Sequence, residues 1–311
     1  MRIGVAVPGD HTHFTADVNA VDLLVGQVRA LAEARVSAAW FVQRFDHDAV
    51  GVAAMAAREV PGIDVGTAVV PIYPRHPVTL SMQAQTAQAA SRGRFTLGVG
   101  MSVKSFVEQT YGIAPHPRVR HLREFLTALR GLLDDGKVDF TGETVVARTS
   151  WPAKVAGADP RVPVLVAAAG DLTLRAAAEL AEGVLPIMSG PRTLAEYTVP
   201  RVTRYAQEAG RPAPRIAAIV SAVVTKDVEG ARERAARTMG PYKDIYRDAL
   251  DREGVANPAE LVAIGDEEVV ARQVRDYFDA GVTELVYTQT ALGSPEDERR
   301  TWQLLGSLTG N

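Results

Sequence analysis

Eight short apolar runs alternate with helical patterns along this chain, and this alternation constrains the fold more than any other feature. The runs are Ile3–Val7, Ala38–Val42, Val65–Val70, Phe95–Val99, Val162–Ala168, Val184–Met188, Ile216–Val224 and Leu285–Tyr287. They are apolar throughout, as is typical of parallel strands that are covered on both faces. Eight β-then-α units predict a (β/α)₈ barrel, or TIM barrel, and an open doubly wound sheet is the alternative.

The segments between the runs carry helix start and stop signals. Leucines spaced by three and four predict a helix that Gly136 ends, and on it Arg120 and Glu124 are predicted to form a surface ion pair. Pro77 suits the first position of a helix that reaches Arg92. Asp171 is the predicted N-cap of the helix that reaches Ala181.

Two stretches are too long for simple connections between a helix and a strand. Residues 137–163 contain "KVDFTGETVVA", which predicts a hairpin around Thr141-Gly142, inserted after the fourth strand. Residues 240–260 predict a mostly helical insertion in the C-terminal part, and we interpret Tyr242 and Tyr246 within it as helix surface rather than as a lid. No shift in composition divides the chain, so we expect one domain over residues 1–311.

Composition excludes several classes of function. The net charge of −3 argues against nucleic acid as a main partner, and the absence of cysteine excludes disulfides, thiolate metal sites and a cysteine nucleophile. No run of about 18 uncharged apolar residues exists, so we expect no membrane partner. The first apolar run is too short for a signal peptide, which makes a cytoplasmic enzyme the default expectation. A homodimer is compatible with the sequence.

Polar residues after the first two predicted strands are candidates for acid–base chemistry, since a barrel places its site at the C-terminal ends of its strands. His11 and His13 follow the first strand and His47 follows the second, and each is a candidate general acid. A His-x-His pair after a first barrel strand is also a start for a metal site. The six histidines all lie in the first half of the chain, so we predict no metal site.

Small residues meet predicted helix N-termini after the fifth and sixth strands. Ala168, Ala169 and Gly170 precede one such helix, and Ser189 and Gly190 precede the next. Exposed amides and the helix dipole at such positions hold phosphate groups, so we predict a phosphate site here. An ordinary turn is the alternative at either position alone.

The chain resembles the bacterial-luciferase-like superfamily of flavin and deazaflavin oxidoreductases. The resemblance is carried by "GTAVVPIYPRHP" at 66–77, "SRGRFTLGVGMS" at 91–102, "AAAGD" and "MSGPRTL", and it runs nearly end to end. The segments "AWFVQRFDHDA" and "AREVPGI" are similar to actinobacterial members that use the deazaflavin coenzyme F420. The resemblance implies a barrel with the coenzyme ring over its C-terminal mouth and the phosphate near the loops after strands five and six. The coenzyme contacts that we infer are Gln43, Ala68, Val69, Gly100, Ser102, Ala168, Ala169, Gly170, Ser189 and Gly190.

The resemblance also implies a non-proline cis peptide in the third strand, which falls at Ala68-Val69. Many relatives end the second strand with an Asp-His pair that assists proton transfer, whereas this chain has Gln43-Arg44 there. Asp46-His47 follows three residues later, which leaves the proton donor open. Arg75 and His76 are interpreted as holding the turn that leaves the third strand.

The leading hypothesis is an F420-dependent oxidoreductase. It would transfer a hydride between the reduced coenzyme and a small organic substrate with an activated C=C, C=N or C=O bond. An FMN-dependent monooxygenase on the same fold is the first alternative. A coenzyme-binding protein without catalysis is the second.

Overall fold

The computed structural model describes residues 1–8, 17–114 and 116–310, and its parallel strands close into a barrel. The barrel strands are β1 (Ile3–Val7), β2 (Ala38–Phe41), β3 (Asp64–Thr67), β5 (Phe95–Gly100), β8 (Val164–Val166), β9 (Gly183–Val184), β10 (Arg215–Val224) and β12 (Glu284–Thr288). Each pairs with the next, and β12 pairs with β1, which closes the ring. The predicted (β/α)₈ barrel is therefore confirmed, and the alternative of an open sheet is wrong.

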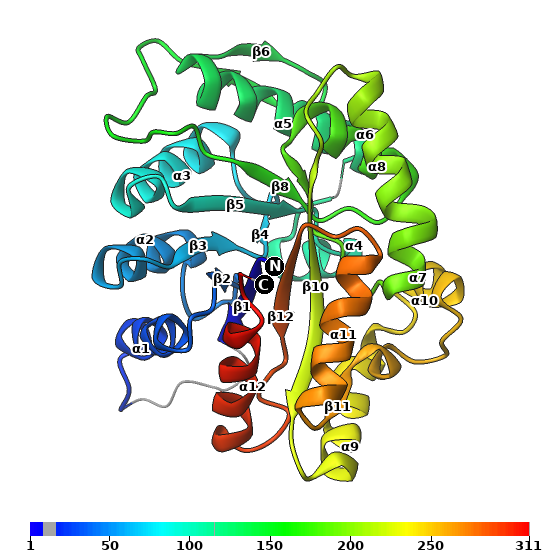
Figure 1. Cartoon of the computed structure of the whole chain (residues 1–311). Helices are drawn as coiled ribbons and strands as arrows, with labels where there is room; N and C mark the ends of the chain where they lie inside the picture. The colour runs from blue at the N-terminus through cyan, green and yellow to red at the C-terminus, as the bar shows by residue number, and fades with distance from the viewer. Residues whose placement is uncertain (9–16, 115, 311) are drawn as a thin grey trace.

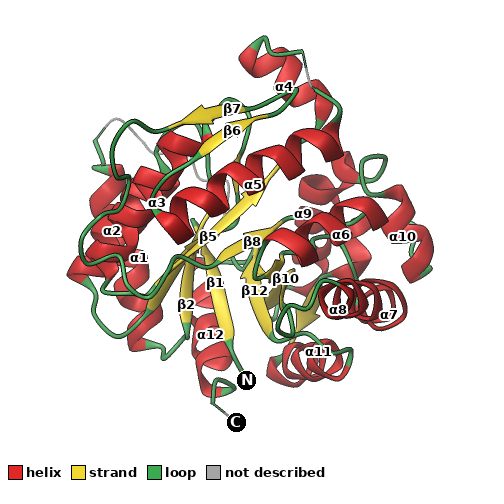
Figure 2. Cartoon of the chain, turned by 90° about the horizontal axis from the view of Figure 1, so that it is seen from above, coloured by secondary structure: helices red, strands yellow, loops and turns green. Residues whose placement is uncertain are grey.

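Helices surround the barrel on its outer side (Figures 1 and 2). They include α1 (Ala20–Glu33), α2 (Ala49–Glu59), α3 (Pro77–Ser91), α5 (Arg118–Asp135), α6 (Asp171–Leu180), α8 (Val199–Glu208), α11 (Glu267–Asp279) and α12 (Pro295–Ser307). Further α-helices are α4 (Lys104–Tyr111), α7 (Pro191–Thr193), α9 (Val228–Met239) and α10 (Arg247–Glu253). No helix in the described ranges is long and apolar enough to span a membrane.

Both predicted insertions are present. The first contains the antiparallel strands β6 (Asp139–Thr141) and β7 (Val146–Arg148), whose connection lies at residues 142–145, close to the expected turn. The second is mostly helical, as predicted, and includes α10. It is followed by a short strand that the sequence did not predict, β11 (Ala263–Gly265). This strand pairs with the C-terminal end of β10.

The third strand is interrupted where the resemblance placed a cis peptide. The Ala68-Val69 bond is cis, β3 ends at Thr67, and pairing to β5 resumes in the short strand β4 (Val70–Pro71). The prediction of one continuous strand over 65–70 is therefore wrong. The cis bond carried over from the family is confirmed.

The largest side chain of the cluster inside the barrel is one indole ring. Trp40 on β2 is 1% exposed, and it lies against two glycines of the neighbouring strands. A Cβ atom on Gly4 would lie 2.6 Å from the Trp40 ring, and one on Gly66 would lie 2.7 Å from it. Only glycine leaves room for the indole at these two positions, so the three residues depend on one another for their packing.

Charged side chains close the N-terminal end of the barrel. Glu284 is 1% exposed and accepts a hydrogen bond from Arg215 Nη2 at 2.7 Å, while Arg2 Nε lies 3.0 Å from the same carboxylate. Arg2 also donates to Asp64 at 2.7 Å, and Arg215 donates to Thr96 at 3.2 Å. These side chains come from four strands and the residue before β1, so they fix the strand ends relative to one another.

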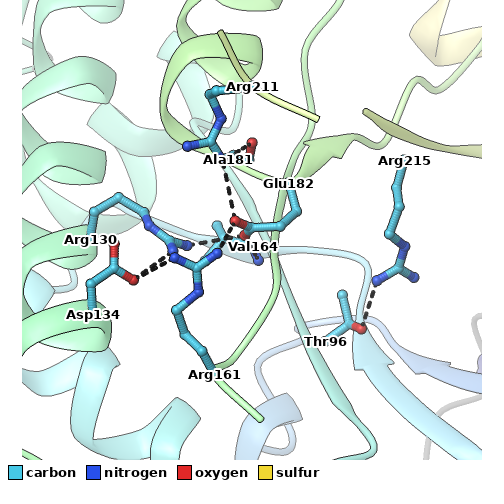
Figure 3. A network of polar contacts seen from close by, with 9 residues as sticks. All are labelled: Thr96, Arg130, Asp134, Arg161, Val164, Ala181, Glu182, Arg211 and Arg215. Atoms are coloured by element: carbon cyan, nitrogen blue, oxygen red, sulfur yellow. Dashed lines mark hydrogen bonds and ion pairs between the residues drawn. The ribbon is translucent and has the colours of Figure 1, made fainter. Parts of the chain in front are cut away.

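A second network lies beside it on the outer side (Figure 3). Glu182 accepts hydrogen bonds from Arg130 at 3.0 Å, Arg161 at 2.8 Å and Arg211 at 3.2 Å, and from the backbone amide of Val164 at 2.8 Å. Because Glu182 precedes β9 and Val164 starts β8, the network ties α5 to the N-terminal ends of two strands. This face of a barrel serves stability.

The hairpin of the first insertion is held by the carboxylate of Glu124 on α5. This carboxylate accepts from the amides of Glu143, Thr144 and Val145 and from the Thr144 hydroxyl, at 2.7 to 3.0 Å. The predicted Arg120–Glu124 ion pair is wrong, because Arg120 pairs instead with Glu143. Burial opposes ionisation of Glu124, but these hydrogen bonds outweigh it and lower its pKa to about 2.

We predict that Gly66→Ala lowers the free energy of unfolding by about 1–3 kcal/mol, since the new methyl group overlaps the Trp40 ring. Gly26→Ala on α1 is the matched control, because a Cβ there meets nothing within 4 Å. It is expected to stabilise the helix by about 0.5–1 kcal/mol. Denaturant unfolding measures both changes. Equal stability of the two variants would contradict the close packing of Gly66 against Trp40.

We predict an acid-dependent loss of stability at Glu124. Its folded pKa of about 2 lies below the usual 4.5, so its contribution is complete above pH 4.5 and is lost as the pH falls toward 2. Because solvent screens this partly exposed carboxylate, Glu124→Gln should cost about 1 kcal/mol at pH 7 and progressively less below pH 4.5. Urea unfolding at several pH values tests this. A cost for Glu124→Gln that does not change with pH, or one no larger than that of the exposed Glu143→Gln, would refute it.

Candidate active site at the barrel mouth

A cavity of about 220 Å³ opens at the C-terminal ends of the barrel strands. Its floor is apolar and includes Ala6, Val42, Ala68, Ile187, Ile219 and Val286, which belong to the same cluster as Trp40 or pack against it. Polar side chains at its edge come from Arg44, Ser189, Ser221, Thr288 and Gln289. A concave, mostly apolar site with a few polar groups is typical of a pocket for a small molecule.

The second insertion forms one wall of this cavity. Residues from the end of α9 through the segment before β11 line it: Thr238, Met239, Tyr242, Tyr246, Pro258, Leu261 and Val262. The interpretation of Tyr242 and Tyr246 as plain helix surface is therefore wrong. The sequence pattern of such a short segment does not show which part of the protein its side chains pack against.

The wall is fixed by the carboxylate of Glu253 at the end of α10. It accepts from the backbone amides of Arg192 at 3.2 Å and Thr193 at 2.8 Å, at the N-terminus of α7. A Cβ on Gly190 would lie 2.2 Å from this carboxylate, so glycine makes room for it. The Arg252 guanidinium also lies 4.0 Å from the centre of the Tyr197 ring.

Glu253 changes the interpretation of one predicted phosphate site. The sequence pattern assigned the amides after Ser189 and Gly190 to a phosphate, but two amides there already donate to Glu253. Gly190 is buried beneath that carboxylate, whereas Ser189 lines the cavity. Glu253 lies about 60 residues further along the chain, so local sequence gave no signal of it.

The N-terminus of α6 is open by comparison. Gly170 is its N-cap and provides no side-chain cap, and Ala169 and Gly170 are exposed while Ala168 is buried. The predicted N-cap role of Asp171 is wrong, because Asp171 is the first helical residue. Its carboxylate accepts from the Tyr205 hydroxyl at 2.7 Å and lies 3.3 Å from Arg201 Nε. That arginine offsets the negative charge next to the open amides.

Of the side chains that follow β2, some form hydrogen bonds within the loop and one lines the cavity. The Gln43 amide donates to the carbonyls of Arg44 at 2.6 Å and His47 at 2.7 Å, and its oxygen accepts from Arg75 at 2.9 Å. The His47 side chain is 2% exposed, with Nδ1 2.8 Å from Asp46 Oδ1 and Nε2 3.1 Å from the Val42 carbonyl. Both side chains therefore organise the loop, and neither lines the cavity.

Arg44 is the residue of this loop that lines the cavity, and sequence reasoning did not select it. A signal was present, since successive side chains of an extended chain point to opposite sides. Trp40 and Val42 face the barrel interior, so Arg44 continues the same side. Its guanidinium lies 3.0 Å from Asp46.

The remaining predicted contacts lie at the ends of β3 and β5. Ala68 lines the cavity, and a Cβ on Gly100 would lie 2.8 Å from Val69, so these backbones approach closely. Ser102 adopts a left-handed φ of 56°, as do Met188 and Gln289 at 53° each, all just beyond barrel strands. Such backbone outliers cluster at functional sites. The candidate acids His11 and His13 lie outside the described residues.

Arg75 and His76 hold the exit of the third strand, as predicted. Arg75 donates to the Pro71 carbonyl at 3.2 Å as well as to Gln43. His76 accepts from the amide of Val78 at 3.2 Å and caps α3, in which Pro77 is the first residue. Its Nε2 lies 2.9 Å from the Val146 carbonyl of the hairpin.

A closed parallel barrel with a cavity at the C-terminal strand ends defines a TIM-barrel enzyme. Comparison with known families makes the assignment specific. The chain belongs to the luciferase-like monooxygenase family, whose model matches residues 1–299. The resemblance inferred from its motifs is thus confirmed, and the protein is an oxidoreductase enzyme of this family.

Two curated relatives are similar over most of their length. The 5,10-methylenetetrahydromethanopterin reductase of Methanopyrus kandleri is 26% identical, over 86% of this chain and 88% of the relative. The F420-dependent glucose-6-phosphate dehydrogenase of Nocardia farcinica is 26% identical, over 76% of this chain and 75% of the relative.

Solved structures share the fold at lower identity. An F420-dependent secondary alcohol dehydrogenase in complex with an F420–acetone adduct has a TM-score of 0.80 at 17% identity, covering 99% of this chain and 97% of that one. The FMN-bound oxygenating constituent of 3,6-diketocamphane monooxygenase from Pseudomonas putida has a TM-score of 0.76 at 16% identity, covering 98% and 97%.

We predict that Glu253→Ala loosens the wall of the cavity. Losing two hydrogen bonds to a charged acceptor should lower the free energy of unfolding by about 1.5–3 kcal/mol. Amide hydrogen exchange should rise over residues 240–257. Glu233→Ala on the exposed side of α9 is the control and should stay within about 0.5 kcal/mol of the wild type. Unchanged exchange in Glu253→Ala would show that other contacts hold the wall.

Proposed function

We propose that this protein is an oxidoreductase that uses coenzyme F420 and acts on a small organic molecule with an activated C=C, C=N or C=O bond. The observation that carries the proposal is the match over most of both chains to a relative named as F420-dependent, the glucose-6-phosphate dehydrogenase. The similarity to the methanopterin reductase supports it.

The residues at the barrel mouth fit a flat ring that carries a phosphate on a side arm. The apolar floor around Ala68 offers a surface for a planar ring, and the close approach of Val69 and Gly100 shapes its edge. The open amides after Ala168, Ala169 and Gly170 are suited to a phosphate. The proposed contacts also include Ser102 and Ser189. Gln43 and Gly190 support the site from behind, through the loop after β2 and beneath the Glu253 carboxylate.

Among these contacts, the α6 N-terminus is the better phosphate site. The α7 amides already donate to Glu253, whereas no side chain caps α6. Asp171 is turned toward Tyr205 and Arg201, which reduces its repulsion of an anion. Ser189 then forms part of the cavity edge, and Gly190 leaves room for the Glu253 carboxylate.

The bound reduced coenzyme would supply a hydride. The chain itself binds and orients both partners and excludes water from the cavity. The ends of β9, β10 and β12 together with the wall from the second insertion enclose the space for the substrate. A group on the chain must also supply a proton. Of the candidates from the sequence, His47 is engaged in the loop and does not line the cavity, and His11 and His13 lie outside the described residues.

Fluorescence titration of the purified protein with F420 and with FMN tests the coenzyme. We expect micromolar affinity for F420 and much weaker binding of FMN. FMN binding without F420 binding would overturn the proposal in favour of an FMN-dependent monooxygenase. Tight F420 binding without oxidation of the reduced coenzyme by any enone, imine or carbonyl compound would favour a binding protein without catalysis.

Within this titration, Gly170→Asp tests the phosphate site. Gly170 has an extended backbone with room for a side chain, and Asp and Asn both cap helices well. Stability should therefore change little in either variant. The added charge should make F420 binding to Gly170→Asp at least tenfold weaker than to the neutral control Gly170→Asn, a difference of about 1.4 kcal/mol. Equal affinities would place the phosphate elsewhere.

A further inference from the structure

The cavity offers few groups that release a proton, and this matters because the proposed reaction needs one. The argument here rests on the proposed function. None of the described residues that line the cavity is His, Asp, Glu or Lys. The Arg44 guanidinium stays protonated in proteins, and aliphatic hydroxyls are weaker acids than a phenol. The acids that remain are the phenols of Tyr242, Tyr246 and Tyr277.

Two of these tyrosines are poorly placed. Tyr277 is 2% exposed, and its hydroxyl donates to the Ser189 carbonyl at 3.2 Å, so its proton is already engaged. Tyr242 is 39% exposed, so water competes for its hydroxyl. Tyr246 is more enclosed than Tyr242 and lines the same cavity.

The hydroxyl of Tyr246 makes no hydrogen bond with any residue that the structure describes. Because Tyr246 lines a mostly apolar cavity and its hydroxyl has no partner among those residues, the hydroxyl is available to a ligand there. Its backbone is well held: the amide donates to the Tyr242 carbonyl at 3.1 Å, and the carbonyl accepts from Leu250 at 3.0 Å. Glu253 fixes the same helix to α7, so the phenol is positioned in advance.

We propose that Tyr246 is the proton donor of the reaction. One atom of the substrate double bond accepts a hydride, and its π electron pair moves to the other atom. That second atom takes the phenolic proton of Tyr246, and the tyrosinate is reprotonated from water. The reduced deazaflavin would be the two-electron donor, and it would be left oxidised once its ring N–H proton passes to water. That proton balances the one that the tyrosinate takes back.

The environment of Tyr246 also keeps its hydroxyl protonated. Burial, together with the neighbouring Tyr242, raises the pKa of Tyr246 above its usual value near 10. Such an acid keeps its proton at neutral pH and gives it best to a strong base. The anion that forms when a hydride adds to an activated C=C, C=N or C=O bond is such a base.

A binding experiment tests the proposal without any coenzyme. The probe is p-nitrophenol, whose oxygen would accept a hydrogen bond from Tyr246 in the coenzyme-free protein. We expect about tenfold weaker binding of p-nitrophenol to Tyr246→Phe than to the wild type. Tyr197→Phe, which loses the same atom outside the cavity, should bind like the wild type. Equal affinity of wild type and Tyr246→Phe, or no binding to either, would overturn the proposal.

Steady-state kinetics with reduced F420 and cyclohex-2-enone provide the second readout. Tyr246→Phe should lower kcat at least 100-fold while the Kd for F420 stays within twofold. An unchanged kcat would overturn the proposal, as would a larger loss in Tyr242→Phe, His11→Gln or His13→Gln. A wild type that binds p-nitrophenol through Tyr246 but does not bind F420 would refute the proposed function and leave the placement of Tyr246 intact.

Discussion

The close fit of one indole ring inside the barrel determines where this molecule has space for chemistry. Trp40 fills the interior because Gly4 and Gly66 leave room for it on both neighbouring strands. Above it, an apolar layer seals the barrel and becomes the floor of the cavity. With the interior filled, the cavity that these side chains form lies at the C-terminal mouth, where barrels of this kind place their sites.

The two ends of the barrel consequently have different roles. Buried and half-buried ion pairs around Glu284 and Glu182 tie the N-terminal strand ends together. At the mouth, by contrast, the described groups that face the cavity are mostly apolar. Glu253 combines both features, because its carboxylate docks the wall of the cavity against the N-terminus of α7.

Much of the fold follows from local sequence, whereas part of the site depends on contacts between distant residues. Each apolar run of the sequence became a barrel strand, since a strand covered on both faces must be apolar throughout. The position of Arg44 at the cavity could have been predicted, because every second side chain from Trp40 through Val42 faces the barrel interior. The position of Glu253 could not, because its partners lie 60 residues away. His47 and Gln43 were chosen for their chemistry, and local hydrogen bonds occupy both of them.

We propose that coenzyme F420 binds at the mouth with its phosphate at the N-terminus of α6 and that the substrate binds on the side of Tyr246. A crystal structure of the protein with bound F420 tests it most directly. The account predicts the ring above Ala68 and the phosphate within hydrogen-bonding distance of the amides after Gly170. A ring bound outside the cavity, or a phosphate that displaces Glu253 from the α7 amides, would contradict it.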